Sequence, residues 1–229
     1  MTGVWVAVAA GAILLAGSAR LLLLRRARRG GGVHERATIE GLSDSTSLDQ
    51  DTGAVRSVQC ADLLIDDEAL KEVWTPANLE RLARTYWRFL TRVTLGLVRV
   101  RYAEQERSVV LLIAPLKLLT FSAPEYEITP TRGMVRWRLE RGLLVAKRGH
   151  GGGHLQIEVQ RSPSEDPKRA LLHVEVEVAN FHPAIASGLG RWLYNLTQSR
   201  IHVIVTHGFL RSLARLDLAQ SRVGRFGGA

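Results

Sequence analysis

The run GHGGGH, residues 149–154, combines glycines with two histidines and could in principle cradle a phosphate group. A P-loop requires a Lys followed by Ser or Thr and opens directly into a helix. This run has no such pair, and strand-like sequences flank it on both sides. We therefore predict a hairpin loop in which Gly supplies the positive φ angles of the turn.

Histidine is a frequent metal ligand, so each closely spaced pair of histidines is a candidate metal site. His150 and His154 share the glycine-rich loop, but no Cys or carboxylate accompanies them there. His202 and His207 are five residues apart, which corresponds to about 140° around a helix, so their side chains point in different directions. His182 could meet His207 in space, but no spacing in the sequence requires it. We predict no metal ligands and no cofactor.

Paired carboxylates can act as a general acid and a general base, and Glu175 and Glu177 lie on one face of a predicted strand. Valines alternate with them, so the carboxylates should face water and form ion pairs with Arg136 or Arg138 on a neighbouring strand. No Gly-x-Ser-x-Gly motif occurs, and the single cysteine, Cys60, excludes an intrachain disulfide and a cysteine-cluster zinc site. We predict no catalytic residues.

The elements that would position these residues are mostly strands. From Leu97 onwards apolar and polar residues alternate, which is typical of an antiparallel sheet with one buried and one wet face. The clearest alternations are LVRVRY at 97–102, MVRWRLER at 134–141, HLQIEVQ at 154–160 and HVEVEV at 173–178. The apolar runs VVLLIAP and LKLLTF, together with GLLVAK after Arg141, bring the expected number to about six to eight strands.

Two helices are expected before these strands, after a first strand in AVRSVQCADLLID. Asp66 or Asp67 is a suitable N-cap for DEALKEVW, and Thr75 followed by Pro76 opens a second helix that ends at Gly96. The second helix has an apolar stripe and an arginine stripe. The apolar stripe is Leu79, Leu82, Tyr86, Phe89, Leu90 and Val93, and the arginines are Arg81, Arg84, Arg88 and Arg92.

A long C-terminal helix is expected after the turn at Asn180–Pro183, because apolar residues there keep helical spacing. IHVIVT, residues 201–206, is β-branched and could instead be a strand. We predict helix throughout, since the flanking segments are both helical in pattern.

The N-terminus carries an apolar run from Val4 to Ala19 that continues through 21–24, with only Arg20 between. About 20 such residues can span roughly 30 Å of hydrocarbon as a helix. Arginines follow at 25, 26, 28 and 29, and a Lys- and Arg-rich flank stays cytoplasmic. No positive charge precedes the run, unlike in a signal peptide. We predict a single-pass cell-membrane anchor over residues 1–29, with the N-terminus outside and the following domain in the cytoplasm.

The remaining chain divides by composition. Residues 30–53 are rich in Gly, Ser, Thr and Asp without apolar periodicity, so we predict a flexible linker. Residues 54–218 then form one α+β domain and 219–229 a flexible tail. The formal net charge of +9 suits an anionic membrane surface, so we expect membrane lipids as partners. Nucleic acid also binds basic proteins, but we find no nucleic-acid-binding motif and predict no such partner.

The order of these elements resembles the helix-grip fold of the START-like (SRPBCC-type) superfamily. The stretch DEALKEVWTPANLERL, residues 67–82, is similar to the opening helices of that family. The resemblance covers about residues 55–217 and implies an antiparallel sheet packed on a long C-terminal helix, with a hydrophobic ligand between them. The chain departs from the family in its longer second helix and its unusually long C-terminal helix.

The resemblance also implies which side chains contact a ligand. They are inward-facing residues of the sheet and of the C-terminal helix: Val135, Trp137, Leu139, Ile157, Val176, Trp192 and Leu196. Aromatic residues are more often part of a core than of a pocket, but they could equally line a cavity if the helix and the sheet do not fully close. The aromatic residues concerned are Trp74, Tyr86, Trp87, Phe89, Trp137, Trp192 and Tyr194. We therefore predict a membrane-anchored domain that binds a lipid or another hydrophobic small molecule. The alternatives are a structural or scaffold protein that acts through protein partners and, ranked third, an enzyme with an apolar substrate.

Overall fold

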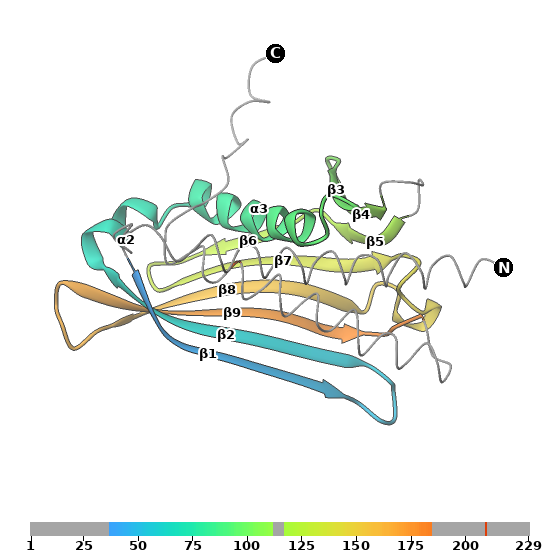
Figure 1. The fold of residues 1–229 in the computed structure, drawn as a ribbon, viewed down its shortest axis with the longest axis horizontal. Helices are drawn as coiled ribbons and strands as arrows, with labels where there is room; N and C mark the ends of the chain where they lie inside the picture. Colours follow the sequence, from blue (N-terminus) through green and yellow to red (C-terminus); the bar gives the residue numbers. More distant parts are fainter. Residues whose placement is uncertain (1–36, 112–116, 185–208, 210–229) are drawn as a thin grey trace, which may run out of the picture.

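The computed structural model of the chain describes residues 37–111, 117–184 and 209. Within these ranges nine strands form one antiparallel sheet, ordered β1-β2-β9-β8-β7-β5-β4-β3, with β6 also paired to β7 (Figure 1). The strands are β1 (Ala37–Leu48), β2 (Val55–Asp66), β3 (Val98–Tyr102), β4 (Glu106–Leu111), β5 (Lys117–Ser122), β6 (Glu125–Ile128), β7 (Arg132–Arg141), β8 (Gly153–Pro163) and β9 (Arg169–Phe181). The helices are α2 (Asp67–Val73) and α3 (Pro76–Val93), with a 3-10 turn, η1 (Lys147–Gly149).

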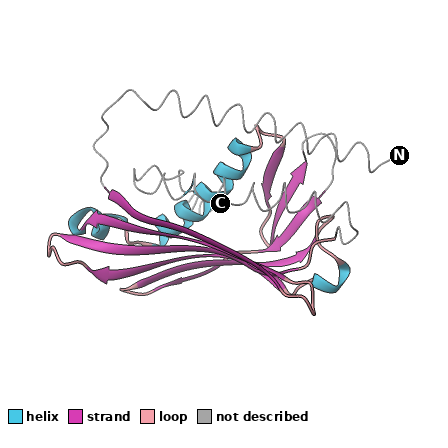
Figure 2. Ribbon diagram, turned by 60° about the horizontal axis from the view of Figure 1, so that its bottom comes forward, coloured by secondary structure: helices cyan, strands magenta, loops and turns pink. Residues whose placement is uncertain are grey.

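Helix α3 lies against one face of the curved sheet, as Figure 2 shows, and no described helix covers the opposite face. We call the face that contacts α3 the inner face and the opposite one the outer face. The α+β class with an antiparallel sheet is thus confirmed for the described residues, with nine strands where about six to eight were expected.

Both helices begin where the capping residues predict. The Asp66 carboxylate accepts hydrogen bonds from the backbone N–H groups of Glu68 and Ala69, at 3.0 and 3.1 Å. The Thr75 hydroxyl caps α3 by accepting from the Asn78 N–H, and Pro76 occupies the first turn. These contacts satisfy amide groups that have no partner within the helix. Helix α3 ends at Val93, three residues before the predicted end at Gly96, and the chain then leaves it through Leu95 and Gly96, which both have positive φ, 57° and 81°.

The core lies between α3 and the inner face. Leu79, Leu82, Tyr86 and Phe89 of the predicted apolar stripe are buried, each with at most 8% of its surface exposed. They meet inward-facing side chains of β2, β7, β8 and β9, which alternate with partly exposed outer-face residues along each strand. The core residues of the two central strands are Val135, Trp137, Leu139, Leu155, Ile157 and Val159.

The interpretation of residues 30–53 as a flexible linker is wrong for residues 37–48, because these form β1. This strand pairs with β2 along its whole length, from Ala37 opposite Ile65 to Leu48 opposite Val55. The sequence of β1 is polar because it is an outermost strand of the described sheet, where backbone hydrogen bonds to β2 hold it in place. The composition of this segment is typical of a linker, but pairing of its backbone with β2 makes it a strand.

Near β5 and β7 one predicted strand is absent and one unpredicted strand is present. GLLVAK, residues 142–147, is not a strand: its only β-bridge among the described residues joins Val145 to Pro183. Leu143 and Leu144 instead donate backbone hydrogen bonds to Lys117 and Leu118 before the chain turns into η1. The short strand β6 was not expected, because its alternation is too brief to stand out.

The predicted membrane anchor and IHVIVT lie outside the described residues. No helix among the described residues is long and apolar enough to cross a bilayer. The predicted C-terminal helix is described only at Phe209, which is helical and completely buried. Its ring stands edge-on to Tyr86 of α3, with the ring centroids 5.7 Å apart.

The backbone after the end of β7 passes close to the backbone of β5 at Gly142, and a substitution there tests this contact. Its φ is +153°, and a Cβ there would lie 2.3 Å from the Leu118 carbonyl oxygen. We expect Gly142→Ala to lower the free energy of unfolding by about 2–3 kcal/mol, because the backbone must move. Gly151→Ala is the control: its φ is also positive, but nothing lies within 4 Å, so its cost should stay near about 1 kcal/mol. Equal losses in urea unfolding of the full-length chain would contradict this geometry.

Candidate functional site on the inner face

The structure brings together the five predicted ligand-contacting residues that it describes. Val135, Ile157 and Val176 are direct cross-strand partners on β7, β8 and β9 and form one row across the inner face. Trp137 and Leu139 continue this surface along β7, and all five are at most 3% exposed. Trp192 and Leu196 lie outside the described residues. The shared surface is confirmed as buried and apolar, while contact with a ligand stays a prediction.

An aromatic cluster joins α3 to this surface. The Trp87 ring stands 5.2 Å from the Trp137 ring and 5.5 Å from the Phe121 ring, measured between centroids. Tyr86 connects the cluster to Phe209. All of these pairs except Trp87–Phe121, which is tilted, pack edge to face, an arrangement that stabilises aromatic pairs beyond the area they bury. Sequence reasoning singled out Tyr86, Trp87 and Trp137 but missed the two phenylalanines, because neither falls in a pattern that predicts contact with α3.

Polar atoms are buried inside this apolar layer without a hydrogen-bond partner among the described residues. They are the indole nitrogen of Trp87 and the side-chain carbonyl oxygen of Gln59. A buried polar atom left unpaired costs about 1–3 kcal/mol. The amide nitrogen of Gln59 is paired, since it donates to the Ser57 hydroxyl at 2.8 Å. The interior thus presents one unpaired donor on α3 and one unpaired acceptor on β2.

Gln59 could have been found from the sequence. In β2 the side chains of Val55, Ala61, Leu63 and Ile65 face the core, and Gln59 falls in the same alternating register. A glutamine at a position reserved for apolar residues is the kind of exception that marks a functional or structural polar contact. The structure buries it completely, with 0% of its surface exposed.

The outer face carries charged side chains that pair with one another, but not as predicted. Glu177 forms an ion pair with Arg56 of β2, in which Arg56 Nε donates to Glu177 Oε1 at 2.7 Å. It does not pair with Arg136 or Arg138. The reason is strand order: β9 lies between β2 and β8, so the β7 arginines are two strands away. Arg138 pairs instead with Glu125 of β6. Alternation predicts the face of each residue but not which strand is its neighbour.

The Cys60 thiol is not an activated nucleophile. Burial raises its pKa above the usual value, and the negative charge of Glu175 opposite it raises the pKa further. A hydrogen bond from Ser43 acts in the other direction as a smaller effect. Because the thiolate and not the thiol attacks electrophiles, this environment does not suit nucleophilic catalysis.

The ion pair between Arg132 and Glu158 gives a pH-dependent prediction. The hydrogen bond from Arg132 holds the pKa of Glu158 below its usual value, although burial opposes this. The pair therefore stabilises the fold above the unfolded-state pKa and loses this effect as pH falls through the lower folded-state pKa. We expect Arg132→Leu to lower the free energy of unfolding by about 0.5–1 kcal/mol at neutral pH, since solvent screens the half-exposed guanidinium. This difference should vanish in acid.

Arg138→Leu is the matched control for the Arg132 measurement. It removes another β7 arginine, but the ion pair to Glu125 is more exposed, with 61% and 44% of the two side chains accessible. Its effect at neutral pH should be smaller. Chemical unfolding at a series of pH values measures both variants, and a loss in Arg132→Leu that persists in acid would contradict the assignment.

Comparisons with known proteins find similarity in structure only. No family model matches the sequence, and no curated protein matches it. Solved structures with distant likeness include human STARD10, 11% identical with a TM-score of 0.30 over 77% of this chain and 73% of that chain. CalU16 from Micromonospora echinospora is 10% identical, with a TM-score of 0.25 over 76% of this chain and 97% of that chain. A conserved protein from Geobacillus kaustophilus is 12% identical, with a TM-score of 0.27 over 68% of this chain and 96% of that chain.

Proposed function

We propose that this chain binds a lipid or another hydrophobic small molecule between α3 and the inner face of the sheet. The observation that carries the proposal is the buried, unpaired indole N–H of Trp87, which lies within the aromatic cluster of α3 and β7. Ligand sites are mainly apolar surfaces with a few polar groups that fix the orientation of the ligand. An acceptor on the ligand, such as an ester or carbonyl oxygen, would pair this donor.

The arrangement of elements supports the same proposal. The order of elements is the one implied by the resemblance to START-like proteins: strand β2, helices α2 and α3, and then strands β3–β9. In such a fold the C-terminal helix would close the ligand site against the inner face. Phe209 is consistent with this, since it is buried against Tyr86 of α3.

Co-purification tests the proposal directly. We expect the full-length chain, extracted in mild detergent, to carry an apolar molecule that native mass spectrometry detects. Trp87→Phe keeps an aromatic ring and removes the N–H, so it should weaken retention of that molecule about five- to tenfold. Its stability without ligand should not fall by the cost of a lost hydrogen bond, because the N–H has no partner among the described residues.

Trp74→Phe is the matched control for that experiment. The indole N–H of Trp74 donates to the Thr129 carbonyl oxygen at 2.8 Å, so this variant should lose stability but keep the ligand. An empty interior in the wild type, or equal ligand retention in wild type and Trp87→Phe, would overturn the proposal.

A scaffold function is the second candidate, and one observation favours it. β1 is an outermost strand of the described sheet, and it exposes Leu42 and Leu48, 40% and 43% accessible. An exposed strand edge can add a strand from a partner protein. Crosslinking in native membranes separates the two candidates, because a scaffold should give β1-dependent protein adducts and a ligand-binding domain should not.

We further propose that residues 1–29 anchor the domain in the cell membrane with its N-terminus outside. The apolar run and the arginines that follow it support this orientation. A tether would raise the local concentration of a membrane-derived ligand. Added protease should therefore digest a C-terminal tag in inside-out vesicles but not in right-side-out vesicles. Digestion in right-side-out vesicles, or recovery of the chain in the soluble fraction, would contradict the anchor.

A further inference from the structure

Four side chains that could form a metal site meet on the outer face where β2 pairs with β9. Cys60 lies directly opposite Glu175, and Asp62 lies directly opposite His173. Since residues two apart on a strand share a face, this register places a thiol, an imidazole and two carboxylates on one side of two neighbouring strands. The glutamate and the cysteine are 115 residues apart in the chain, so no sequence motif marks the cluster.

The distances suit a small cation. The potential ligand atoms of Cys60, His173 and Glu175 all lie within 4.8 Å of one another, and the sulfur is 3.9 Å from a carboxylate oxygen of Glu175. Ligands of a tetrahedral zinc ion are about 3.5 Å apart, given bonds of about 2.0–2.3 Å. The three side chains would therefore need to close by only about 1 Å, which rotation about their side-chain bonds can supply.

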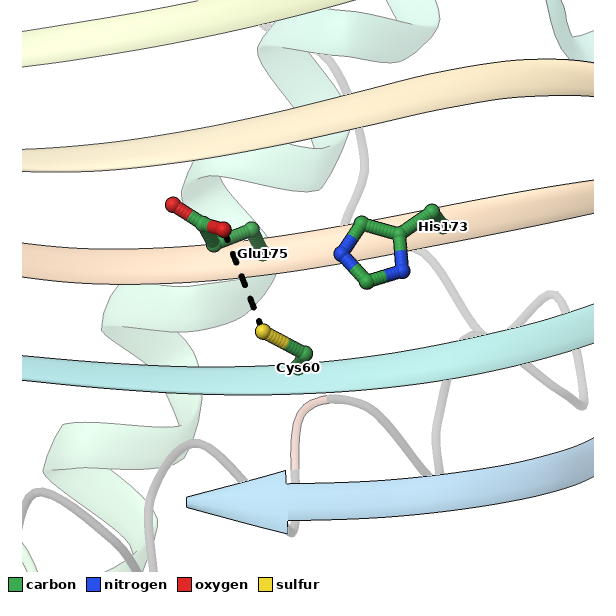
Figure 3. Close-up of side chains that lie close together, drawn as sticks. All are labelled: Cys60, His173 and Glu175. Carbon is green, nitrogen blue, oxygen red and sulfur yellow. Dashed lines mark hydrogen bonds between the residues drawn. The ribbon is translucent and has the colours of Figure 1, made fainter. Parts of the chain in front are cut away.

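Asp62 lies where it can orient the imidazole of His173. Its carboxylate lies 2.7 Å from Nδ1 of His173. In the neutral tautomer that carries its hydrogen on Nδ1, Nδ1–H donates to this carboxylate and the other ring nitrogen keeps the lone pair that a metal ion needs. Figure 3 shows that the imidazole turns a ring nitrogen towards the Cys60 sulfur and the Glu175 carboxylate. Metal-binding histidines are oriented by carboxylates in just this way.

We propose that Cys60, His173 and Glu175 bind a Zn²⁺ ion, with Asp62 as the positioning residue for the imidazole. A thiolate, a neutral imidazole and a carboxylate are the ligand types that zinc takes in proteins, and the two anionic ligands would balance the charge of the ion. Three protein ligands leave a fourth position for water. The side chains of His173 and Asp62 are 41% and 46% exposed, so the ion can enter from solvent.

This site lies on the opposite face of the sheet from the hydrophobic ligand proposed above and shares no side chain with it. Its side chains are on the outer face, whereas Val174 and Val176 of the same strand are fully buried on the inner face. Failure of one proposal therefore leaves the other intact.

Metal titration of the full-length chain tests the site. After treatment with a chelator, the wild type should bind one equivalent of Zn²⁺ in equilibrium dialysis. Cys60→Ser and His173→Ala should each lower the affinity at least about 100-fold, and Asp62→Asn about 10- to 100-fold. Co²⁺ in place of Zn²⁺ should give a near-ultraviolet sulfur-to-metal charge-transfer band that is absent in Cys60→Ser.

Glu177→Gln and His154→Ala are the matched controls, because they remove an outer-face carboxylate and an outer-face histidine that do not belong to the cluster. Both should bind Zn²⁺ as the wild type does. Thermal unfolding without metal checks that each variant folds. If Cys60→Ser does not fold, the Co²⁺ spectrum of the wild type still tests whether sulfur is a ligand. Zn²⁺ binding that survives in Cys60→Ser, or a wild-type Co²⁺ complex without the charge-transfer band, would overturn the proposal.

Discussion

The antiparallel pairing of β2 with β9 is the interaction on which the rest of the structure depends. It places the β1–β2 hairpin beside the β7–β8–β9 strands and so makes one sheet of them. The paired residues are far apart in the chain, 115 positions for Cys60 and Glu175, and closing a loop of this length costs entropy. Burial on the inner face offsets that cost: Ala61, Leu63 and Val174 are at most 2% exposed.

The register of this pairing decides what each face can do. The side-chain period of a strand is two, so a slip of one residue would exchange the faces. Cys60 and Asp62 would then enter the core, and Leu63 would be exposed to water. Because such a slip buries a carboxylate and exposes leucine, the native register is strongly favoured. The same constraint that fixes the apolar surface against α3 therefore also holds the thiol, imidazole and carboxylates together on the outer face.

Sequence patterns predicted the elements that local rules determine. The caps at Asp66 and Thr75, the apolar stripe of α3 and the buried rows of β7, β8 and β9 all follow from neighbouring residues. Strand β1 was missed because most of its side chains are polar and exposed, so only its backbone pairing with β2 identifies it as a strand. Two other features were missed for a different reason: the ion-pair partner of Glu177 and the cluster at Cys60. Both depend on the order of strands in the sheet, which the alternation of apolar and polar residues does not determine.

Strand β9 links the two proposed sites physically. Val174 and Val176 face the core while His173 and Glu175 face outwards, so a hydrophobic ligand and a metal ion would contact alternate residues of one strand. A strand cannot move on one face alone, because each shift of its backbone carries both sets of side chains. If ligand binding displaces β9 by a fraction of an ångström, it changes the spacing of the metal ligands, and metal binding must change ligand affinity by the same factor. Because β9 is paired with β2 on one side and with β8 on the other along most of its length, such a displacement, and the coupling that follows from it, should be small.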